Sequence, residues 1–351
     1  MNICLYSSAF FPNIGGLEQV SYTLANYWAK QEHKVNIVTD TPATDDQDTS
    51  YIFPVTRCPN FESWKTLLNK SDCIISNGYS LKHLAVWLLS RKPIIWIHPI
   101  YIPKLFQDGQ NSLTSLIKPL LRRMFLPLGA GHIYISHAIK QQVGARKGVV
   151  IYNPIENQFR PLANIKIDND FAFFGRMIPD KGVDTLLEAL AICKRKNKIY
   201  KLDLYGEGSY VEELRQLAFT LGIESQLRWY PFLRGEKLVQ AMNAAGVVVV
   251  PSRWAEPMGI VAVEAMACGK AVIGSRWGGL GEVLEGYGMT FENGNAEQLA
   301  ECMIQLKEHP DLQINLEKKA YERSHDFLID TIGTKYLKII ESILNNRLKN
   351  R

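Results

Sequence analysis

Short runs of apolar residues alternate along this chain with longer segments whose apolar residues recur at helical spacing. The short runs are rich in valine and isoleucine, which is typical of strands buried on both faces. Buried strands that alternate with helices predict parallel sheets covered by helices on both sides. The predicted strands are Asn2–Tyr6, Lys34–Thr39, Cys73–Ser76, Ile94–Ile97, His132–Ile135, Val149–Ile151, Asp170–Phe174, Lys201–Tyr205, Leu227–Trp229, Val247–Val250, Ala271–Gly274 and Gly288–Thr290. The predicted helices include Leu17–Lys30, Val183–Lys194, Val211–Leu221, Lys237–Ala244 and Ile260–Cys268.

The pattern stops and restarts at one Pro/Asn-rich stretch, "NPIENQFRPLANIKIDN", which covers residues 153–169 and is typical of a linker. A chain of 351 residues is expected to fold as two domains, with one large domain as the alternative. We therefore predict two doubly wound α/β domains, at residues 1–155 and 156–330. Residues 331–351 are expected to form one amphipathic helix that ends in a basic tail.

The composition is that of an ordinary globular protein, with 46% hydrophobic and 21% charged residues. No apolar run reaches the roughly 18 residues that a membrane span requires. The first residues, "MNICLYSS", lack the basic flank and long apolar run of a signal peptide, so we expect a cytoplasmic protein. The six cysteines show no metal-binding spacing and are expected to be buried, reduced thiols.

Positive charge is concentrated between Pro99 and Ile151, a segment that contains seven Lys/Arg residues and a single acid, Asp108. This segment contains an apolar stripe at helical spacing over residues 113–128, with three basic residues beside it. One hypothesis is a helix that contacts anionic membrane at the inner face and reaches a lipid-linked acceptor. The alternative is an ordinary helix of the first domain whose stripe is core and whose charges are solvated.

Candidate chemistry lies in the loops that follow strands, because open α/β sheets bind ligands beyond the carboxyl ends of their strands. Gly15 and Gly16 precede the first helix and would allow an anion to approach its amides, with a plain tight turn as the alternative. Arg176 and Lys181 bracket a loop before a later helix and would suit a diphosphate, with solvated side chains as the alternative.

A glycine pair, Gly206 and Gly208, also follows a predicted strand. The dinucleotide fingerprint GxGxxG would require a third glycine where Val211 stands. The incomplete motif argues against a NAD-dependent oxidoreductase. It favours a loop that passes close to a ligand or to another loop.

Two glutamates stand out in the apolar segment "PSRWAEPMGIVAVEAMACGK". Glu256 is predicted in a loop at the mouth of a helix, and Glu264 one turn below Ile260 on one face of that helix. Two carboxylates around a helix N-terminus would suit a nucleotide sugar, which has a diphosphate between hydroxylated rings. The alternative is that Glu256 caps the helix and Glu264 pairs with a basic residue of the core.

Three histidines and one aspartate pair are further candidates for functional groups. His98 ends a predicted strand and is expected to face an interdomain cleft, with a structural hydrogen bond as the alternative. His132 and His137 lack acidic partners and are predicted to be structural. The "DND" at Asp168–Asp170 resembles a metal-binding DxD, but it stands where a strand begins, which is the wrong end for a site.

Taken in order, these segments resemble the retaining glycosyltransferases of family 4, which have the GT-B fold. The resemblance covers nearly the whole chain. Two elements are specific: the glutamates of "EPMGIVAVE", spaced by seven residues, and the GRxxxxKG pattern of "GRMIPDKG". Two departures leave the acceptor open, because "NPIE" stands where relatives often have Asn-Gly and the loops around Thr41–Phe61 are short. Further matched pieces are "FFPNIGGLEQV", "WIH", "YISHAIKQQV", "LYGEGSYVEELRQLAFTLGI" and "GKAVIGSRWGGLGEV".

The resemblance implies two Rossmann-like domains facing a cleft, with the C-terminal helix returning to the first, acceptor-side domain. It implies that Arg176 and Lys181 neutralise the donor diphosphate, that Glu264 accepts ribose hydroxyls and that Glu256 holds the donor sugar. The implied catalytic residues are His98, Arg176, Lys181 and Glu256. The implied donor-binding residues are Gly15, Gly16, Gly175, Arg176, Lys181, Gly206, Glu256, Met258, Gly259, Ile260 and Glu264.

The resemblance also implies transfer of a hexose from a nucleotide sugar to a saccharide or lipid-linked saccharide, in cell-surface polysaccharide or glycoconjugate synthesis. The anomeric configuration would be retained, and neither a metal nor a separate cofactor would be needed. We expect a UDP-sugar, with glucose or N-acetylglucosamine ahead of GDP-mannose, and no nucleic acid partner. The alternatives are a GT-B sugar-nucleotide epimerase and a non-catalytic relative that binds nucleotide sugars.

Overall fold

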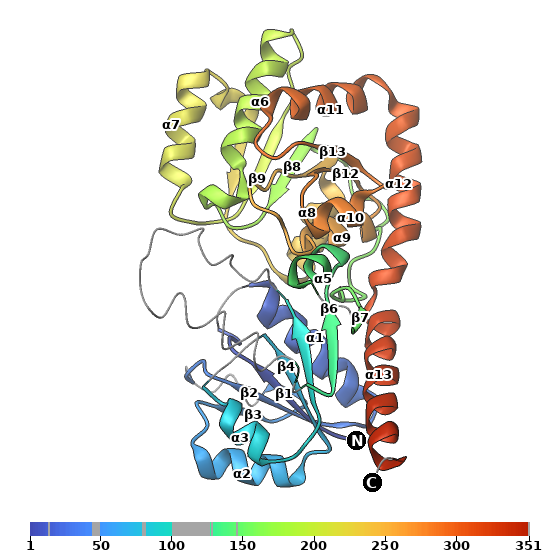
Figure 1. The fold of residues 1–351 in the computed structure, drawn as a ribbon. Helices are drawn as coiled ribbons and strands as arrows, with labels where there is room; N and C mark the ends of the chain where they lie inside the picture. Colours follow the sequence, from blue (N-terminus) through green and yellow to red (C-terminus); the bar gives the residue numbers. More distant parts are fainter. Residues whose placement is uncertain are drawn as a thin grey trace. The chain divides into compact units, whose positions relative to one another are not determined.

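The computed structural model divides the chain into two compact units. Unit 1 consists of Met1–Pro154 together with Ile329–Arg351, and unit 2 of Ile155–Leu328. Each unit is built on its own parallel sheet (Figure 1). The residues that the structure describes are 1–12, 15–43, 50–78, 82–99, 127, 129–144 and 147–349.

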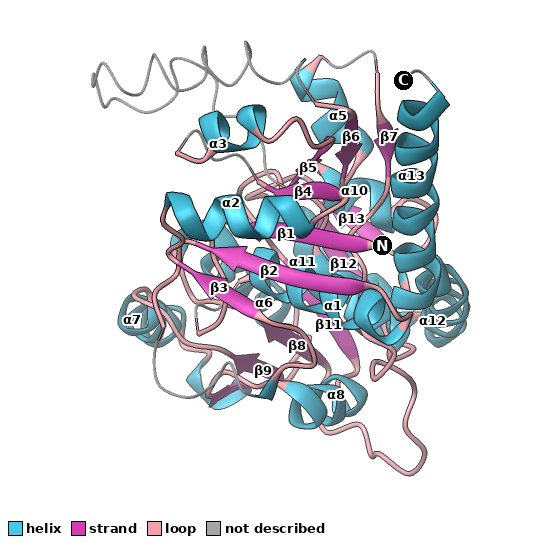
Figure 2. Cartoon of the chain, turned by 90° about the horizontal axis from the view of Figure 1, so that it is seen from below, coloured by secondary structure: helices cyan, strands magenta, loops and turns pink. Residues whose placement is uncertain are grey.

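The sheet of unit 1 has seven strands in the order β3-β2-β1-β4-β5-β6-β7. All of its pairings are parallel, as the buried apolar runs predict. Strands β3, β2 and β1 lie side by side in Figure 2. The strands are β1 (Asn2–Ser7), β2 (Lys34–Thr39), β3 (Val55–Arg57), β4 (Cys73–Asn77), β5 (Ile94–His98), β6 (Gly131–Tyr134) and β7 (Val149–Val150).

The C-terminal helix α13 (Ile329–Lys349) packs within unit 1 against α1 (Gly16–Lys30), as the two ribbons in Figure 1 show. The hydroxyl groups of Tyr27 and Thr334 lie 2.9 Å apart, and Trp28 donates its indole N–H to the carbonyl of Gly333. The chain therefore returns to its first unit after completing the second. The other helices of unit 1 are α2 (Phe61–Lys70), α3 (Leu84–Leu89) and α5 (His137–Val143).

The sheet of unit 2 has six parallel strands in the order β10-β9-β8-β11-β12-β13. Its strands are β8 (Phe171–Phe174), β9 (Leu202–Tyr205), β10 (Leu227–Tyr230), β11 (Val247–Val250), β12 (Ala271–Ser275) and β13 (Met289–Phe291). Its helices are α6 (Val183–Arg195), α7 (Val211–Leu221), α8 (Gly235–Ala244), α9 (Ile260–Ala267), α10 (Gly279–Leu284), α11 (Ala296–Glu308) and α12 (Pro310–Ser324).

The strand order of unit 2 fixes where a ligand site can form. The chain builds β8, β9 and β10 outward in one direction and then returns to place β11 on the other side of β8. The connections that leave β8 and β11 therefore diverge, and open α/β sheets bind ligands at such a switch point, beyond the carboxyl ends of the two strands. The loops at residues 175–182 and 251–259 both begin there.

The glycine pair after β9 lets one loop pass against another. A Cβ atom on Gly206 would lie 1.8 Å from the carbonyl oxygen of Gly175, and one on Gly208 would lie 2.1 Å from that of Met177. The Met177 amide donates to the carbonyl of Glu207 at 2.8 Å. The glycines thus fix the loop that carries Arg176, which agrees with the predicted close approach between loops.

Gly182 provides a test of this packing. Its φ is +66°, and a Cβ atom there would lie 2.0 Å from the carbonyl oxygen of Pro251. We expect Gly182→Ala to lower the free energy of unfolding by about 3 kcal/mol or more, because left-handed strain and overpacking add. Gly222→Ala is the matched control, since Gly222 has a φ of +63° and a Cβ atom there would meet only the Lys194 ammonium, at an ordinary contact distance of 3.8 Å. It should lose only about 1 kcal/mol. Equal losses in urea denaturation would contradict the close contact.

Candidate functional site

An ion pair joins the two loops that diverge from β8 and β11. Lys181 Nζ lies 2.5 Å from Glu256 Oε1, and the Glu256 carboxylate is buried. Lys181 also lies over the indole ring of Trp254, 5.8 Å from its centroid. The sequence singled out both charged residues but gave them separate roles. The structure brings them into direct contact.

Glu256 is held through both its side chain and its backbone. Ser252 donates its hydroxyl to Glu256 Oε1 at 2.7 Å, so this oxygen accepts from a hydroxyl and an ammonium together. The Gly279 amide donates to the Glu256 carbonyl at 2.7 Å. No described residue donates to the other carboxylate oxygen, Oε2. A carboxylate oxygen without a protein donor is available to a ligand hydroxyl.

The N-terminus of α9 lies just beyond this pair along the chain. Gly259 is its N-cap residue, and no side chain caps the helix. The alternative in which Glu256 caps this helix is therefore wrong. Met258 is buried, whereas Ile260 is half-buried at the first helical position. An uncapped helix N-terminus carries partial positive charge, which favours an anion.

Glu264 follows one turn into α9 and is also buried. The described residues form no ion pair with its carboxylate and donate no hydrogen bond to it, so the alternative of a core salt bridge is not observed. Burial, and then the nearby Glu156 carboxylate, raise the pKa of Glu264 to about 8. Without a ligand, Glu264 therefore carries a proton at neutral pH.

The remaining predicted residues of unit 2 lie on the same loops. Arg176 is exposed and directly follows Gly175, at the end of β8. Gly206 is buried against Gly175. The exposed guanidinium of Arg176 and the ammonium of Lys181 therefore occupy the two ends of one loop.

Three predicted residues belong to unit 1. His98 ends β5 and is completely buried, with Nε2 3.2 Å from His132 Nδ1 and its ring 4.1 Å from that of Tyr134. Burial, and then His132, lower the pKa of His98 to about 3, so the ring is neutral at pH 7. From the sequence, His132 was predicted to be structural and was not linked to His98. The β5–β6 pairing brings the two imidazoles together.

Gly15 and Gly16 begin α1 as predicted, with Gly15 at the N-cap. The carboxylate of Glu18 reaches back to this turn, since a Cβ atom on Gly15 would lie 2.7 Å from Glu18 Oε2. Glu18 is itself buried in the first turn of the helix. A negative charge therefore already lies at this helix N-terminus, which the sequence reasoning did not foresee.

Comparison with known proteins agrees with this architecture. Residues 14–159 match the sequence model described as "Glycosyltransferase Family 4", and residues 154–323 match that of "Glycosyl transferases group 1". The chain is a protein of the glycosyltransferase family 4 type. Anabaena HepE in complex with UDP has the same fold, with a TM-score of 0.81 at 22% identity over 97% of this chain and 100% of that one.

Curated relatives of this family 4-type protein match over different lengths. An uncharacterized glycosyltransferase of Methanocaldococcus jannaschii is 26% identical over 81% of this chain and 83% of its own length. A second one from that organism is 32% identical, over 60% of this chain and 59% of its own length. The D-inositol 3-phosphate glycosyltransferase of Saccharomonospora viridis is 35% identical, over 44% of this chain and 38% of its own length. The match thus spans less than two thirds of the length of two of these three relatives.

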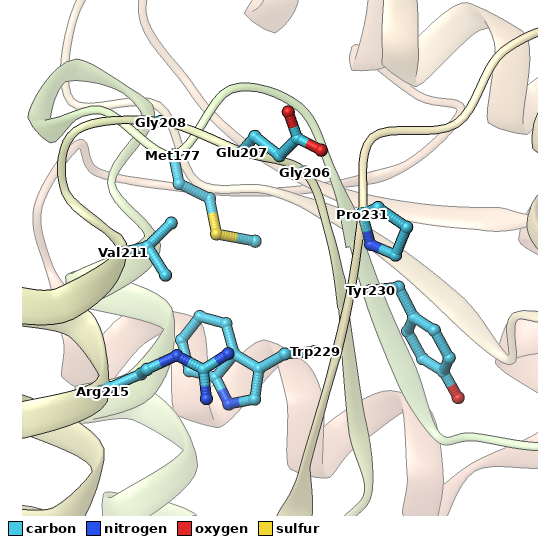
Figure 3. A pocket seen from close by; sticks show the side chains of 9 residues that line it. All are labelled: Met177, Gly206, Glu207, Gly208, Val211, Arg215, Trp229, Tyr230 and Pro231. Atoms are coloured by element: carbon cyan, nitrogen blue, oxygen red, sulfur yellow. The ribbon is translucent and has the colours of Figure 1, made fainter.

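A cavity of about 360 Å³ lies in unit 2, between the carboxyl end of β10 and the start of α7 (Figure 3). The guanidinium of Arg215 covers the ring of Trp229 at 4.7 Å and forms one wall. Met177 points into the space, whereas Tyr230 points away from it. Of the lining residues, only Gly206 was a predicted site residue. The full lining is Met177, Gly206, Glu207, Gly208, Val211, Arg215, Trp229, Tyr230 and Pro231.

Other sequence-based expectations have mixed outcomes. Asp168 pairs with Arg228 and Asp170 with Lys307, so the "DND" aspartates form structural ion pairs at the start of β8. All six cysteines are free, but Cys58 is exposed and the prediction of burial is wrong for it. The apolar stripe at 113–128 falls almost entirely outside the described residues. None of the described helices is long and apolar enough to cross a membrane.

The Lys181–Glu256 pair can be tested by a double-mutant cycle. Lys181→Met leaves a buried carboxylate without its cation, and we expect a loss of about 3 kcal/mol in the free energy of unfolding. Adding Glu256→Gln should recover part of this loss, with a coupling of about 1 kcal/mol or more. The solvent-exposed Lys198–Glu308 pair is the control and should show little or no coupling, because water screens its charges. Equal coupling in the two pairs would contradict a Lys181–Glu256 interaction that is partly shielded from water.

Proposed function

We propose that this protein transfers a hexose from a nucleoside diphosphate sugar to a saccharide or lipid-linked saccharide, with retention of anomeric configuration. The observation that carries the proposal is the partly buried Lys181–Glu256 pair beside the uncapped start of α9, with unpartnered Glu264 one turn further. UDP is favoured as the nucleotide, and glucose or N-acetylglucosamine as the sugar. Anabaena HepE, which shares the fold, is known in complex with UDP and glucose.

In this proposal the diphosphate lies at the N-terminus of α9. The amides of that helix and the cations Lys181 and Arg176 would balance its charge. Lys181 uses one of its three N–H groups on Glu256 and keeps the others for a phosphate oxygen. The same groups would stabilise the charge that builds up on the leaving phosphate, which is where electrostatic catalysis acts.

The sugar would lie against Glu256. Oε1 is engaged by Lys181 and Ser252, so Oε2 is left to accept hydroxyl hydrogens from the hexose. The bond between the anomeric carbon and the phosphate oxygen breaks as the acceptor oxygen forms a bond on the same face. The acceptor's proton passes to the leaving phosphate. The protein would therefore position the two substrates and neutralise the charge of the diphosphate, without providing a base.

Glu264 would accept hydrogen bonds from the ribose hydroxyls, and the protonation state of its carboxyl group gives a test of this contact. The free carboxyl has a pKa of about 8 and holds a proton at pH 7. Ribose hydroxyls donate to the ionised form and stabilise it, so binding should lower this pKa and release up to one proton at pH 7. Calorimetry of UDP binding in buffers with different ionisation enthalpies measures that proton.

Proton release should disappear in Glu264→Gln and should fade in the wild type above about pH 9, where Glu264 is already ionised. Glu207→Gln is the control, because Glu207 is exposed and lies outside the proposed ribose contact. Proton release that persists in Glu264→Gln would contradict the ribose assignment.

Turnover on a panel of UDP-, GDP- and ADP-sugars tests the function itself. We expect release of the nucleoside diphosphate from at least one donor. Lys181→Ala or Glu256→Gln should lower turnover by at least about 100-fold, because each removes a charge next to the reacting centre. Lys196→Ala is the matched control, since Lys196 is an exposed lysine at the other end of α6.

Circular dichroism should show that the inactive variants remain folded. Conversion of the donor to its epimer without transfer would indicate an epimerase instead. Tight binding without any turnover would indicate a non-catalytic relative. Near-normal rates in Lys181→Ala or Glu256→Gln would contradict the site.

A further inference from the structure

One side chain outside the predicted site touches both loops that support Glu256. Asn293 lies in the loop that follows β13, at the edge of the sheet of unit 2. Its Oδ1 accepts from the amide of Trp277 at 3.2 Å. Its Nδ2 donates to the carbonyl oxygens of Ser252 at 3.0 Å and Trp254 at 3.3 Å. One amide group thus links the loops that follow β11, β12 and β13.

A first pair of hydrogen bonds connects Asn293 through Ser252 to the Glu256 carboxylate. Asn293 binds the Ser252 carbonyl, and the hydroxyl of the same serine donates to Glu256 Oε1 at 2.7 Å. Ser252 is completely buried, so its hydroxyl has a fixed direction. A shift of the Ser252 backbone would therefore move the hydrogen bond that orients Glu256. Lys181 shares that oxygen and would be affected with it.

The second support runs through the loop after β12 to the backbone of Glu256. Asn293 holds the amide of Trp277, two residues before Gly279. The Gly279 amide then donates to the Glu256 carbonyl at 2.7 Å, and residues 256 and 278 form an isolated parallel bridge. The backbone and the side chain of Glu256 are thus both fixed through contacts of Asn293.

We propose that Asn293 is a positioning residue that sets Glu256 against Lys181 for the transfer reaction. The proposal rests on the proposed function of the Lys181–Glu256 pair. An amide is suited to this place because it offers an acceptor to Trp277 and two donors to the carbonyls of Ser252 and Trp254. No other side-chain type of this size offers both. Misplacement of a reacting group by about 1 Å can cost about 100-fold in rate, although Asn293 itself touches no substrate.

The test compares Asn293→Ala with Asn295→Ala. Asn295 is the matched control, because it is the same residue type two positions away and only caps α11, where it accepts from the Gln298 amide. Both variants should lower the thermal stability. Only Asn293→Ala should lower kcat, by about 10- to 100-fold, with a smaller change in KM for the donor, because Lys181 and Glu256 act most strongly in the transition state.

Hydrogen exchange gives a readout that needs no activity. In the wild type the Trp277 amide is held by Asn293, so Asn293→Ala should speed its exchange and that of residues 252–256. Asn293→Asp keeps the acceptor for Trp277 but sets a carboxylate against two carbonyl oxygens. It should protect the Trp277 amide and still lower kcat. Asn295→Ala should change neither region.

The outcomes separate the two proposals. Unchanged exchange in Asn293→Ala, or faster exchange with kcat within about twofold of the wild type, overturns the positioning role while the function stands. A wild type that turns over no donor overturns the function. In that case hydrogen exchange alone decides whether Asn293 holds the loops that follow β11 and β12. Faster exchange of Trp277 and residues 252–256 in Asn293→Ala, but not in Asn295→Ala, would support that role.

Discussion

The arrangement of unit 2 depends on one ion pair that joins the loops following β8 and β11. Lys181 and Glu256 come from loops that leave the sheet in opposite directions, and their contact ties these loops together. Burying a carboxylate is costly unless hydrogen bonds and a cation compensate for the lost hydration. Ser252 donates directly to the carboxylate, whereas Gly279 and Asn293 hold the backbone on which Glu256 and Ser252 stand.

The fold could be predicted well from the sequence because each buried parallel strand is a short β-branched run with a clear end. β11, with four consecutive valines, is the plainest example. β3 was missed because its three residues, Val55–Arg57, are only half-buried at the edge of the sheet and form no apolar run. Sequence periodicity detects burial, and an edge strand provides little of it.

The sequence could nominate residues for the candidate site but could not predict the contacts between them. Lys181 and Glu256 are 75 positions apart, and only the placement of β11 beside β8 brings them together. The same holds for His98 and His132, which meet through the β5–β6 pairing. Asn293 left no signal in the sequence, because an asparagine in a polar loop usually forms a turn. Its role depends on three backbone groups whose positions only the fold determines.

Glu256 and Glu264 differ in how many hydrogen-bond and ion-pair partners the protein gives their carboxyl groups, and that difference bears on function. Glu256 is paired at one oxygen, whereas Glu264 is buried without a partner and keeps a proton instead. A core residue under selection for stability alone would be paired or apolar, because an unsatisfied buried carboxyl lowers stability. Sites that sacrifice stability in this way are commonly the places where a ligand provides the missing partner. Binding of a polyol at Glu264 would therefore stabilise the protein as well as position the ligand, because the hydroxyls complete a hydrogen-bonding group that the fold leaves open.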